Sequence, residues 1–264
     1  MKIILGNPKS KKRLLVLAGV HGNEYTPCIV LNNIMQNESI IALLREQYKS
    51  ITFIYNVNND GLKNNTREYT AIDLNRIYQY DFSLIDKIKD LVKESTHIID
   101  LHSSPHCGNF ILINQTDTAN SYVEYAINNG LNYLIYNQYS TLTIKHQSQL
   151  LNKISVTFEM NGIDFVNFNN VKSAQIELEK LITTFHTIKI AKEEPKYKTQ
   201  TMINAIQDGI YYVNQFNELN CLTLGNKNYT YKVLDDNDYI ATYPIKGYYT
   251  TGEMVLLVQK HNNI

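Results

Sequence analysis

The stretch LVLAGVHGNE, residues 15–24, gives the strongest indication of the fold. Its first six residues are small or apolar, which is typical of a buried strand, and a polar turn follows at once. That turn carries an imidazole, His21, and a carboxylate, Glu24. A second apolar run with a polar end follows in IIDLH, residues 98–102. Two strand ends that each deliver metal-binding side chains suggest a zinc site made of two histidines and one glutamate.

The composition is that of an ordinary globular protein. The 264 residues are 44% apolar, carry a formal net charge of zero and have scattered Lys and Arg, which argues against a nucleic-acid partner. No apolar run approaches the roughly 20 residues that span a bilayer, and residues 1–8 do not resemble a secretory signal. The three cysteines are widely spaced, so we expect no disulfide framework and a cytoplasmic location.

Strand-like and helix-like segments alternate along the first two thirds of the chain. We expect strands at residues 14–20, 51–57, 97–101, 110–113, 131–136 and 154–158, and helices at 26–35, 83–94, 121–129 and 174–190. This alternation predicts an α/β fold with a mostly parallel sheet covered by helices on both faces. Ligands bind beyond the carboxyl ends of such strands, where we place His21, His102 and Glu159.

The composition changes at residues 191–196, where charged residues and a proline interrupt the pattern. Short strand-like runs follow at residues 209–213, 228–234, 239–243 and 254–258, separated by turn residues. We therefore expect a catalytic domain over residues 1–193 and a small all-β domain over residues 194–264.

The metal ligands that we expect are His21, Glu24 and His102. Taken singly, a histidine near a strand end is more often a capped or solvent-facing residue, and only the combination favours a metal. His106 and Cys107 are rival ligands close to His102. A cysteine ligand would favour a structural site, whereas two histidines and a glutamate leave one coordination position open for water.

Two carboxylates near the expected site have separate uses. Asp100 is placed to fix the tautomer of a histidine ligand from behind. Glu159 follows an apolar strand, and partial burial would raise its pKa toward the range of a general base. The alternative for Glu159 is a helix-capping or salt-bridged residue.

The run Asp73-Leu74-Asn75-Arg76 offers a carboxylate clamp, because a guanidinium binds a carboxylate with two hydrogen bonds and the asparagine adds a donor. Arg67, in the long polar segment before it, is within reach of the same pocket. A surface turn with a solvated arginine is the alternative.

Together these motifs resemble those of the succinylglutamate desuccinylase/aspartoacylase family, which are zinc-dependent N-acyl amino acid amidohydrolases with a carboxypeptidase-like fold. The matches are G-x-H-G-N-E at residues 19–24, D-L-N-R at 73–76 and D-L-H at 100–102, and the resemblance runs over nearly the whole chain. The segments around residues 222–224, 243–244 and 248–253 resemble the family's tail, from which Tyr248 would enter the active site.

The resemblance implies a role for each matched residue. His21, Glu24 and His102 would hold one zinc ion per chain, and Glu159 would be the general base. Arg67 would stabilise the oxyanion. Asn75 and Arg76 would bind the α-carboxylate of an N-acyl amino acid. The family also makes a homodimer plausible.

Two positions depart from the family pattern. The segment from Arg67 to Asn75 is one residue longer than usual, and an alignment on Tyr69 would put Glu68 in place of the arginine. Gln149 stands ten residues before Glu159, where aspartoacylases have an arginine that binds the substrate's side-chain carboxylate. Lys145 or His146 would have to supply a replacement charge, unless the amino-acid side chain is neutral.

Two alternatives to the amidohydrolase remain. A zinc carboxypeptidase acting on short peptides would share the ligands and the carboxylate clamp but needs an open groove. A catalytically silent metal-binding homologue would keep the scaffold alone.

Overall fold

The computed structural model describes most of the first 192 residues in full. Beyond residue 200 it describes backbone strands only. The fully described ranges are residues 1–80, 82–104, 109–114, 116, 118–136, 142–162 and 166–192, except for the side chains of Ile77, Ser104 and Tyr136.

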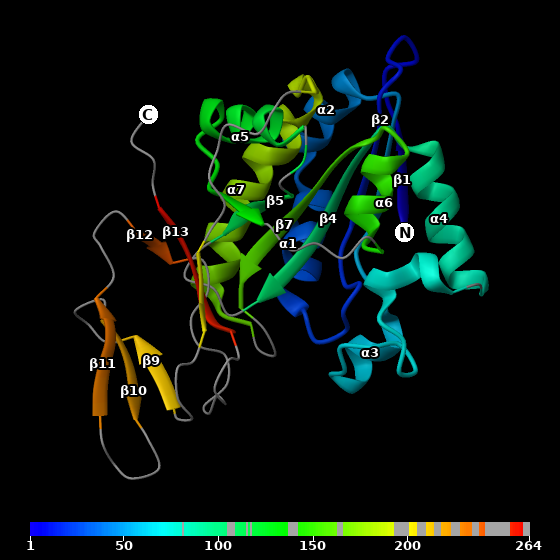
Figure 1. Ribbon diagram of the computed structural model, residues 1–264. Coiled ribbons are helices and arrows are strands. Elements are labelled where there is room, and N and C mark those ends of the chain that lie inside the picture. Colours follow the sequence, from blue (N-terminus) through cyan, green and yellow to red (C-terminus); the bar gives the residue numbers. More distant parts are fainter. Residues whose placement is uncertain are drawn as a thin grey trace.

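A seven-stranded mixed sheet forms the centre of the fold over the first 192 residues (Figure 1). Its strands are β1 (Lys2–Leu5), β2 (Arg13–Leu17), β3 (Ser50–Ile54), β4 (His97–Ser104), β5 (Phe110–Asn114), β6 (Tyr133–Tyr136) and β7 (Ile154–Asn161). The order across the sheet is β1-β3-β2-β4-β7-β5-β6. Strands β3, β2, β4 and β7 are parallel, whereas β1 is antiparallel to β3 and β5 is antiparallel to β7.

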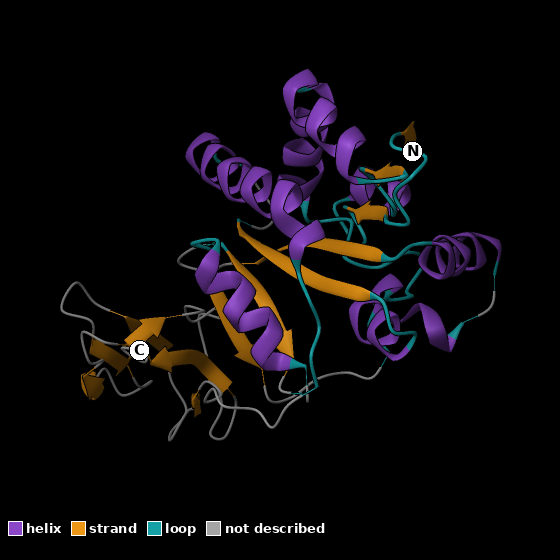
Figure 2. Ribbon diagram, turned by 90° about the horizontal axis from the view of Figure 1, so that it is seen from above, coloured by secondary structure: helices purple, strands orange, loops and turns teal. Residues whose placement is uncertain are grey.

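Helices cover both faces of this sheet (Figure 2). They are α1 (Tyr25–Gln36), α2 (Glu38–Gln47), α3 (Asn59–Asn64), η1 (Leu74–Gln79), α4 (Ser83–Glu94), α5 (Ala119–Asn128), α6 (Ile144–Leu150), α7 (Phe168–Thr184) and η2 (Phe185–Thr187). Buried residues of α1, α2, α5 and α7 join the larger apolar cluster on one face. Buried residues of α4, η1 and α6 join a smaller cluster on the other.

Alternate residues of β4 explain this layering. Ile99 and Leu101 belong to the larger cluster, while Ile98 belongs to the smaller one. Successive side chains of a strand point to opposite faces, and a parallel strand covered on both faces must be apolar on both. On the face of the smaller cluster, β4 changes from Ile98 to Asp100 and His102 as it approaches its carboxyl end.

The predicted α/β architecture is confirmed, and the structure extends two of its strands. β4 and β7 run to Ser104 and Asn161, three residues beyond the predicted ends in each case. His102 and Glu159 therefore lie within these strands rather than beyond them, and they are partners in the parallel ladder. Three α-helices that we did not predict, α2, α3 and α6, are also present among the described residues.

The C-terminal part contains six further strands in two antiparallel three-stranded sheets, ordered β11-β10-β9 and β12-β13-β8. They are β8 (Thr201–Asn204), β9 (Ile210–Val213), β10 (Glu218–Leu222), β11 (Asn228–Val233), β12 (Asp238–Ile240) and β13 (Met254–Lys260). Residues 193–200, where we placed the domain boundary, lie outside the described residues. In the described part of the chain, no helix has the length and apolar character needed to cross a membrane.

Candidate metal centre

The loop between β2 and α1 brings His21 and Glu24 to the carboxyl edge of the sheet. Gly19 turns the chain with a φ of 69°, a left-handed conformation that glycine adopts without strain. At Gly22 the loop packs directly on the backbone of Gly61, so any side chain there would clash. Glu24 is the N-cap residue of α1, which fixes its backbone at the start of a regular helix.

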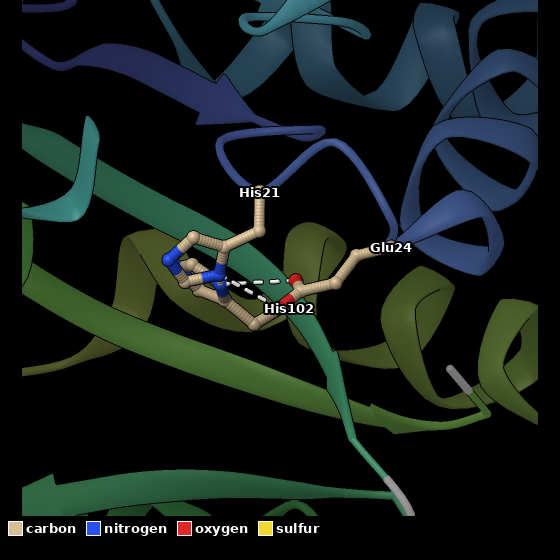
Figure 3. Close-up of side chains that lie close together, drawn as sticks. All are labelled: His21, Glu24 and His102. Atoms are coloured by element: carbon tan, nitrogen blue, oxygen red, sulfur yellow. Dashed lines mark hydrogen bonds and ion pairs between the residues drawn. The ribbon is translucent and has the colours of Figure 1, made fainter. Parts of the chain in front are cut away.

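His102 on β4 completes a compact group with these two residues (Figure 3). His21 Nδ1 lies 2.7 Å from Glu24 Oε1, and His102 Nδ1 lies 3.1 Å from both Glu24 Oε2 and His21 Nδ1. The backbone N–H of Ser103 also donates to Glu24 Oε2 at 3.0 Å. The three side chains are all buried, and their ligand atoms lie within 4.8 Å of one another.

The charges of this group favour a cation. Burial alone would raise the pKa of Glu24, but the two neighbouring imidazoles outweigh it and lower the pKa to about 2. Burial likewise would lower the pKa of His102, but Asp100 and Glu24 raise it well above its usual value. A site that attracts a proton this strongly also attracts a metal ion, and the two would compete.

A further carboxylate contacts the Nε2 atom of each histidine, on the opposite side of the ring from Nδ1. His21 Nε2 lies 3.2 Å from Asp73 Oδ1, and His102 Nε2 lies 3.0 Å from Asp100 Oδ2. Such contacts fix the tautomer so that the opposite nitrogen, here Nδ1, is free to bind a metal. We anticipated Asp100 from the sequence. We missed the contact of Asp73, for which its place in the D-L-N-R motif was the only signal.

These residues fit a metal ion with three protein ligands. Two imidazole nitrogens and a carboxylate oxygen are a usual ligand set for catalytic zinc, which keeps an open fourth position. The closed alternative that we considered, with His106 or Cys107 as a ligand, falls outside the described residues.

The D-L-N-R motif lies beside this group, with Asp73 just before η1 and the other three residues at its start. The backbone N–H of Asn75 donates to Asp73 Oδ1 at 2.8 Å, and Asn75 Nδ2 lies 3.3 Å from His102 Nε2. Arg76 Nη1 donates to the carbonyl oxygen of Asn75 at 3.0 Å, and its side chain is 31% exposed. The backbone N–H of Ile144, at the start of α6, donates to Asn75 Oδ1 at 3.2 Å.

Arg67 reaches the same group from the polar segment after α3. Its Nη1 lies 3.7 Å from Glu24 Oε1, and its Nη2 lies 3.9 Å from Asp73 Oδ2. The side chain is 48% exposed, so these are long, solvent-screened ion pairs. The structure thus places the guanidinium of Arg67 beside the cluster, while Glu68 is exposed.

Glu159 is partly buried and is the ladder partner of His102, so the two share a face of the sheet. On the same face lies Lys145 of α6, which is only 3% exposed. Burial lowers the pKa of Lys145 to about 7, although the charges of Glu159 and Asp100 oppose the change. We had considered Lys145 as a replacement charge for the substrate but not as a buried residue.

Gln149 does not lie at this site, contrary to our expectation. Its Nε2 donates to the carbonyl oxygen of Ser155 at 3.1 Å, and the ladder partner of Ser155 is Ile98, four residues before His102. The chain reverses direction between helix α6 and strand β7, so Gln149 lies near the start of β7 and Glu159 near its end. The two residues are therefore apart in space although only ten residues separate them in sequence. The glutamine instead lines a cavity of about 420 Å³ near the start of β7.

Tyr248 and its neighbours lie outside the described residues, so the place of Tyr248 relative to the cluster stays a prediction.

Comparisons with solved structures identify the same fold elsewhere. A succinylglutamate desuccinylase/aspartoacylase from Rhodobacter sphaeroides is 13% identical, with a TM-score of 0.71 over 99% of this chain and 88% of that one. The product-bound ectoine utilization protein EutE (DoeB) from Ruegeria pomeroyi is 14% identical, with a TM-score of 0.69 over 98% and 88%. A metallo-carboxypeptidase from Burkholderia cenocepacia is 14% identical, with a TM-score of 0.53 over 69% and 59%.

No curated protein sequence matches the chain. The family profile described as succinylglutamate desuccinylase/aspartoacylase catalytic domain matches residues 10–183, a span that includes His21, Glu24, His102 and Glu159. This match covers well over half of the chain and agrees with the resemblance seen in the motifs. The chain therefore belongs to the succinylglutamate desuccinylase/aspartoacylase family.

Proposed function

We propose that this protein is a zinc-dependent amidohydrolase that cleaves the amide bond of an N-acyl amino acid, releasing a carboxylate and a free amino acid. The observation that carries this proposal is the buried group of His21, Glu24 and His102, whose ligand atoms lie within 4.8 Å of one another. Membership of a deacylase family supports the reaction class.

His21, Glu24 and His102 would hold one zinc ion, with Asp73 and Asp100 orienting the imidazoles. When bound, zinc would lower the pKa of a water molecule to about 7 and polarise the scissile carbonyl. The ligand group is buried, which strengthens electrostatic interactions with a bound substrate.

Glu159 would take the proton of the attacking water and pass it to the leaving amine. Its ladder pairing with His102 supports this role, because it directs the carboxylate to the face of the sheet that carries the ligands. Arg67 would donate to the oxyanion that forms on the scissile carbonyl. Its partial exposure leaves the guanidinium accessible to substrate.

Asn75 and Arg76 would bind the α-carboxylate of the amino acid. The hydrogen bond from the Ile144 N–H occupies Asn75 Oδ1 and leaves the amide NH₂ beside the ligand group, 3.3 Å from His102 Nε2. The amide orientation thus offers a donor rather than an acceptor, as an anion requires. Arg76 adds a planar fork for bidentate contact.

The C-terminal domain, residues 194–264, would cap this site and contribute Tyr248. We further propose that the protein acts in the cytoplasm as a homodimer. Gln149 lies away from the cluster and so does not take the place of the arginine that reads an acidic side chain in aspartoacylases. Substrates with neutral side chains therefore belong in any test beside acidic ones.

The test is amine release from a panel of N-acetyl, N-formyl and N-succinyl amino acids, with short peptides included, using protein of measured zinc content. Glu159→Gln removes the proposed base with little change of shape, and Glu124→Gln on the exposed side of α5 is a matched control. We expect activity on one substrate group that falls on the order of a hundredfold or more in Glu159→Gln alone.

Other outcomes separate the alternatives. Turnover of peptides but not of acyl amino acids would replace the proposal with a carboxypeptidase. Full zinc occupancy without turnover of any member would indicate a catalytically silent homologue.

A further inference from the structure

Lys145 is a buried cation, which requires a stabilising environment. Among the residues that the structure describes, it is the single Lys or Arg that is buried, at 3% exposure. Burying an ammonium group is costly unless opposite charges or hydrogen bonds compensate it. The segment around it, on α6, is short and polar, so general helix packing does not account for it.

The ammonium group is anchored on the sheet. Lys145 Nζ donates to the carbonyl oxygen of Leu112 at 3.1 Å and to Asn114 Oδ1 at 2.7 Å. Both acceptors are neutral groups of β5. They fix the position of the ammonium group but do not balance its charge.

Strand register aligns the β5 anchor of this group with Asp100, with β7 between them. Leu112 is the partner of Thr157 on β7, and Thr157 is the partner of Asp100 on β4. The next row in the direction of the site contains Phe110, Glu159 and His102. Lys145 Nζ is therefore anchored at the row of Asp100, one row before the row of Glu159, and it acts on Asp100 by its charge across β7 rather than through a direct ion pair.

Asp100 is a buried carboxylate that requires a compensating positive charge. Its side chain is completely buried, and it contacts His102 Nε2 at 3.0 Å. Within the described residues, no backbone N–H donates to either of its oxygens. A buried carboxylate held by one imidazole lacks the several hydrogen bonds that usually stabilise such a charge.

We propose that Lys145 is the internal counter-ion of the metal centre, a positioning residue that stabilises Asp100 behind His102 and holds Glu159 in its working place. The part that concerns Glu159 rests on the proposed function, whereas the pairing with Asp100 does not. Lys145 does not touch substrate. It acts through the two carboxylates.

The charged groups around Lys145 come from three elements. They are Asp100 on β4, Glu159 on β7 and His146 on α6, while β5 presents only the neutral groups of Leu112 and Asn114. From η1 the charged side chain is Arg76, which pairs with Asp73. Because burial places the pKa of Lys145 near 7, the counter-charge disappears as the pH rises above neutrality.

The first experiment is a double-mutant cycle of Lys145→Met and Asp100→Asn, measured by thermal unfolding of the full chain with zinc and after chelation. Lys145→Met leaves Asp100 buried without this counter-charge, so we expect the variant to lower Tm by roughly 6–12 °C. The double variant should lose less than the sum of the single losses. Additive losses would overturn the pairing.

The second experiment measures kinetics per zinc-loaded molecule. We expect Lys145→Met to lower kcat about tenfold or more with KM nearly unchanged, as for other supporting residues of metal centres. We expect the activity of the wild type to decline at alkaline pH as Lys145 loses its proton. Lys145→Arg, which keeps its charge at all working pH values, should restore part of kcat and flatten that decline. Lys153→Met, in the turn after α6, is the control and should match the kcat of the wild type.

The outcomes separate this inference from the proposed function. A Lys145→Met variant that is less stable but has an unchanged kcat and pH profile would reduce Lys145 to a structural role. If the wild type cleaves nothing in the panel, the proposed function fails, and the unfolding cycle still decides whether Lys145 pairs with Asp100.

Discussion

The two faces of the central sheet use the same strands for different purposes. On one face, β7 presents Val156, Phe158 and Met160 to the larger apolar cluster. On the other, the same strand presents Ser155, Thr157 and Glu159. Helices cover both faces, yet near the carboxyl end of β7 the second face carries polar and charged groups in place of apolar ones. The comparison suggests that stability rests mainly on the first face and metal chemistry on the second.

The two ends of β4 repeat this contrast within a single strand. His97, at the start, lies against Tyr48 and Phe185, and burial lowers its pKa to about 4, with the charges of Lys12 and His186 acting in the same direction. His102, five residues later, lies between two carboxylates that raise its pKa despite burial. Burial therefore favours the neutral form of His97 at one end of β4, whereas neighbouring carboxylates favour a bound cation at His102 at the other.

The largest effect that we expect is on the polar face. Glu24→Gln removes the carboxylate ligand with little change of shape. Zinc affinity should fall by at least about a hundredfold, because even supporting residues behind a ligand cost that much, and activity should be lost. Chelator competition measures the affinity, with Glu124→Gln as the control. Unchanged zinc binding would show that this cluster does not hold the metal.

The matching test on the apolar face is Phe158→Ala. Phe158 is completely buried in the larger cluster, so the truncation leaves a cavity that costs about 3–5 kcal/mol of the free energy of unfolding. Zinc affinity of the folded protein should change little, because the side chain points away from the ligands. Urea unfolding and chelator competition on the same samples measure both. A large loss of zinc affinity would show that the two faces are coupled.

The sequence was most informative where the chain is apolar. The run before His21 and the alternation of strands and helices predicted the sheet, because burial on both faces imposes a continuous apolar pattern. Helix α6 was missed for the opposite reason. Its residues include the buried Lys145, His146 and Ser148, which no hydrophobic pattern would mark.

The site followed the same rule. Motif residues such as His21, Glu24 and His102 were predicted as a group, and the structure brings their ligand atoms together. Gln149 was misplaced because a spacing in sequence does not give a distance once a helix reverses into a strand. Lys145 shows the same limit, since its partners come from β5, a strand without any sequence motif.

A smaller effect on the polar face is expected from Asp100→Asn. The amide keeps the shape but loses the charge that orients His102 and supports its basicity. Zinc affinity should fall roughly 10–100-fold, less than for loss of a ligand. Chelator competition at neutral pH measures the difference. A loss as large as that of Glu24→Gln would mean that Asp100 binds the metal itself.

The smallest effect concerns His97, at the far end of β4. Because the pKa of His97 in the folded protein, about 4, is below its ordinary value of 6.5, the unfolded chain binds a proton more readily. Above pH 6.5 His97 is neutral in both states, so its full contribution to stability is present. Below that pH the unfolded chain binds a proton that the folded protein does not, so the free energy of unfolding decreases as the pH falls toward 4. Between pH 7 and pH 5.5 the wild type should lose about 1 kcal/mol more than His97→Gln. Chemical unfolding at the two pH values measures this. The metal centre is unchanged in the variant, so its own pH dependence cancels in the comparison. Parallel losses in both proteins would show that His97 is not held neutral by burial.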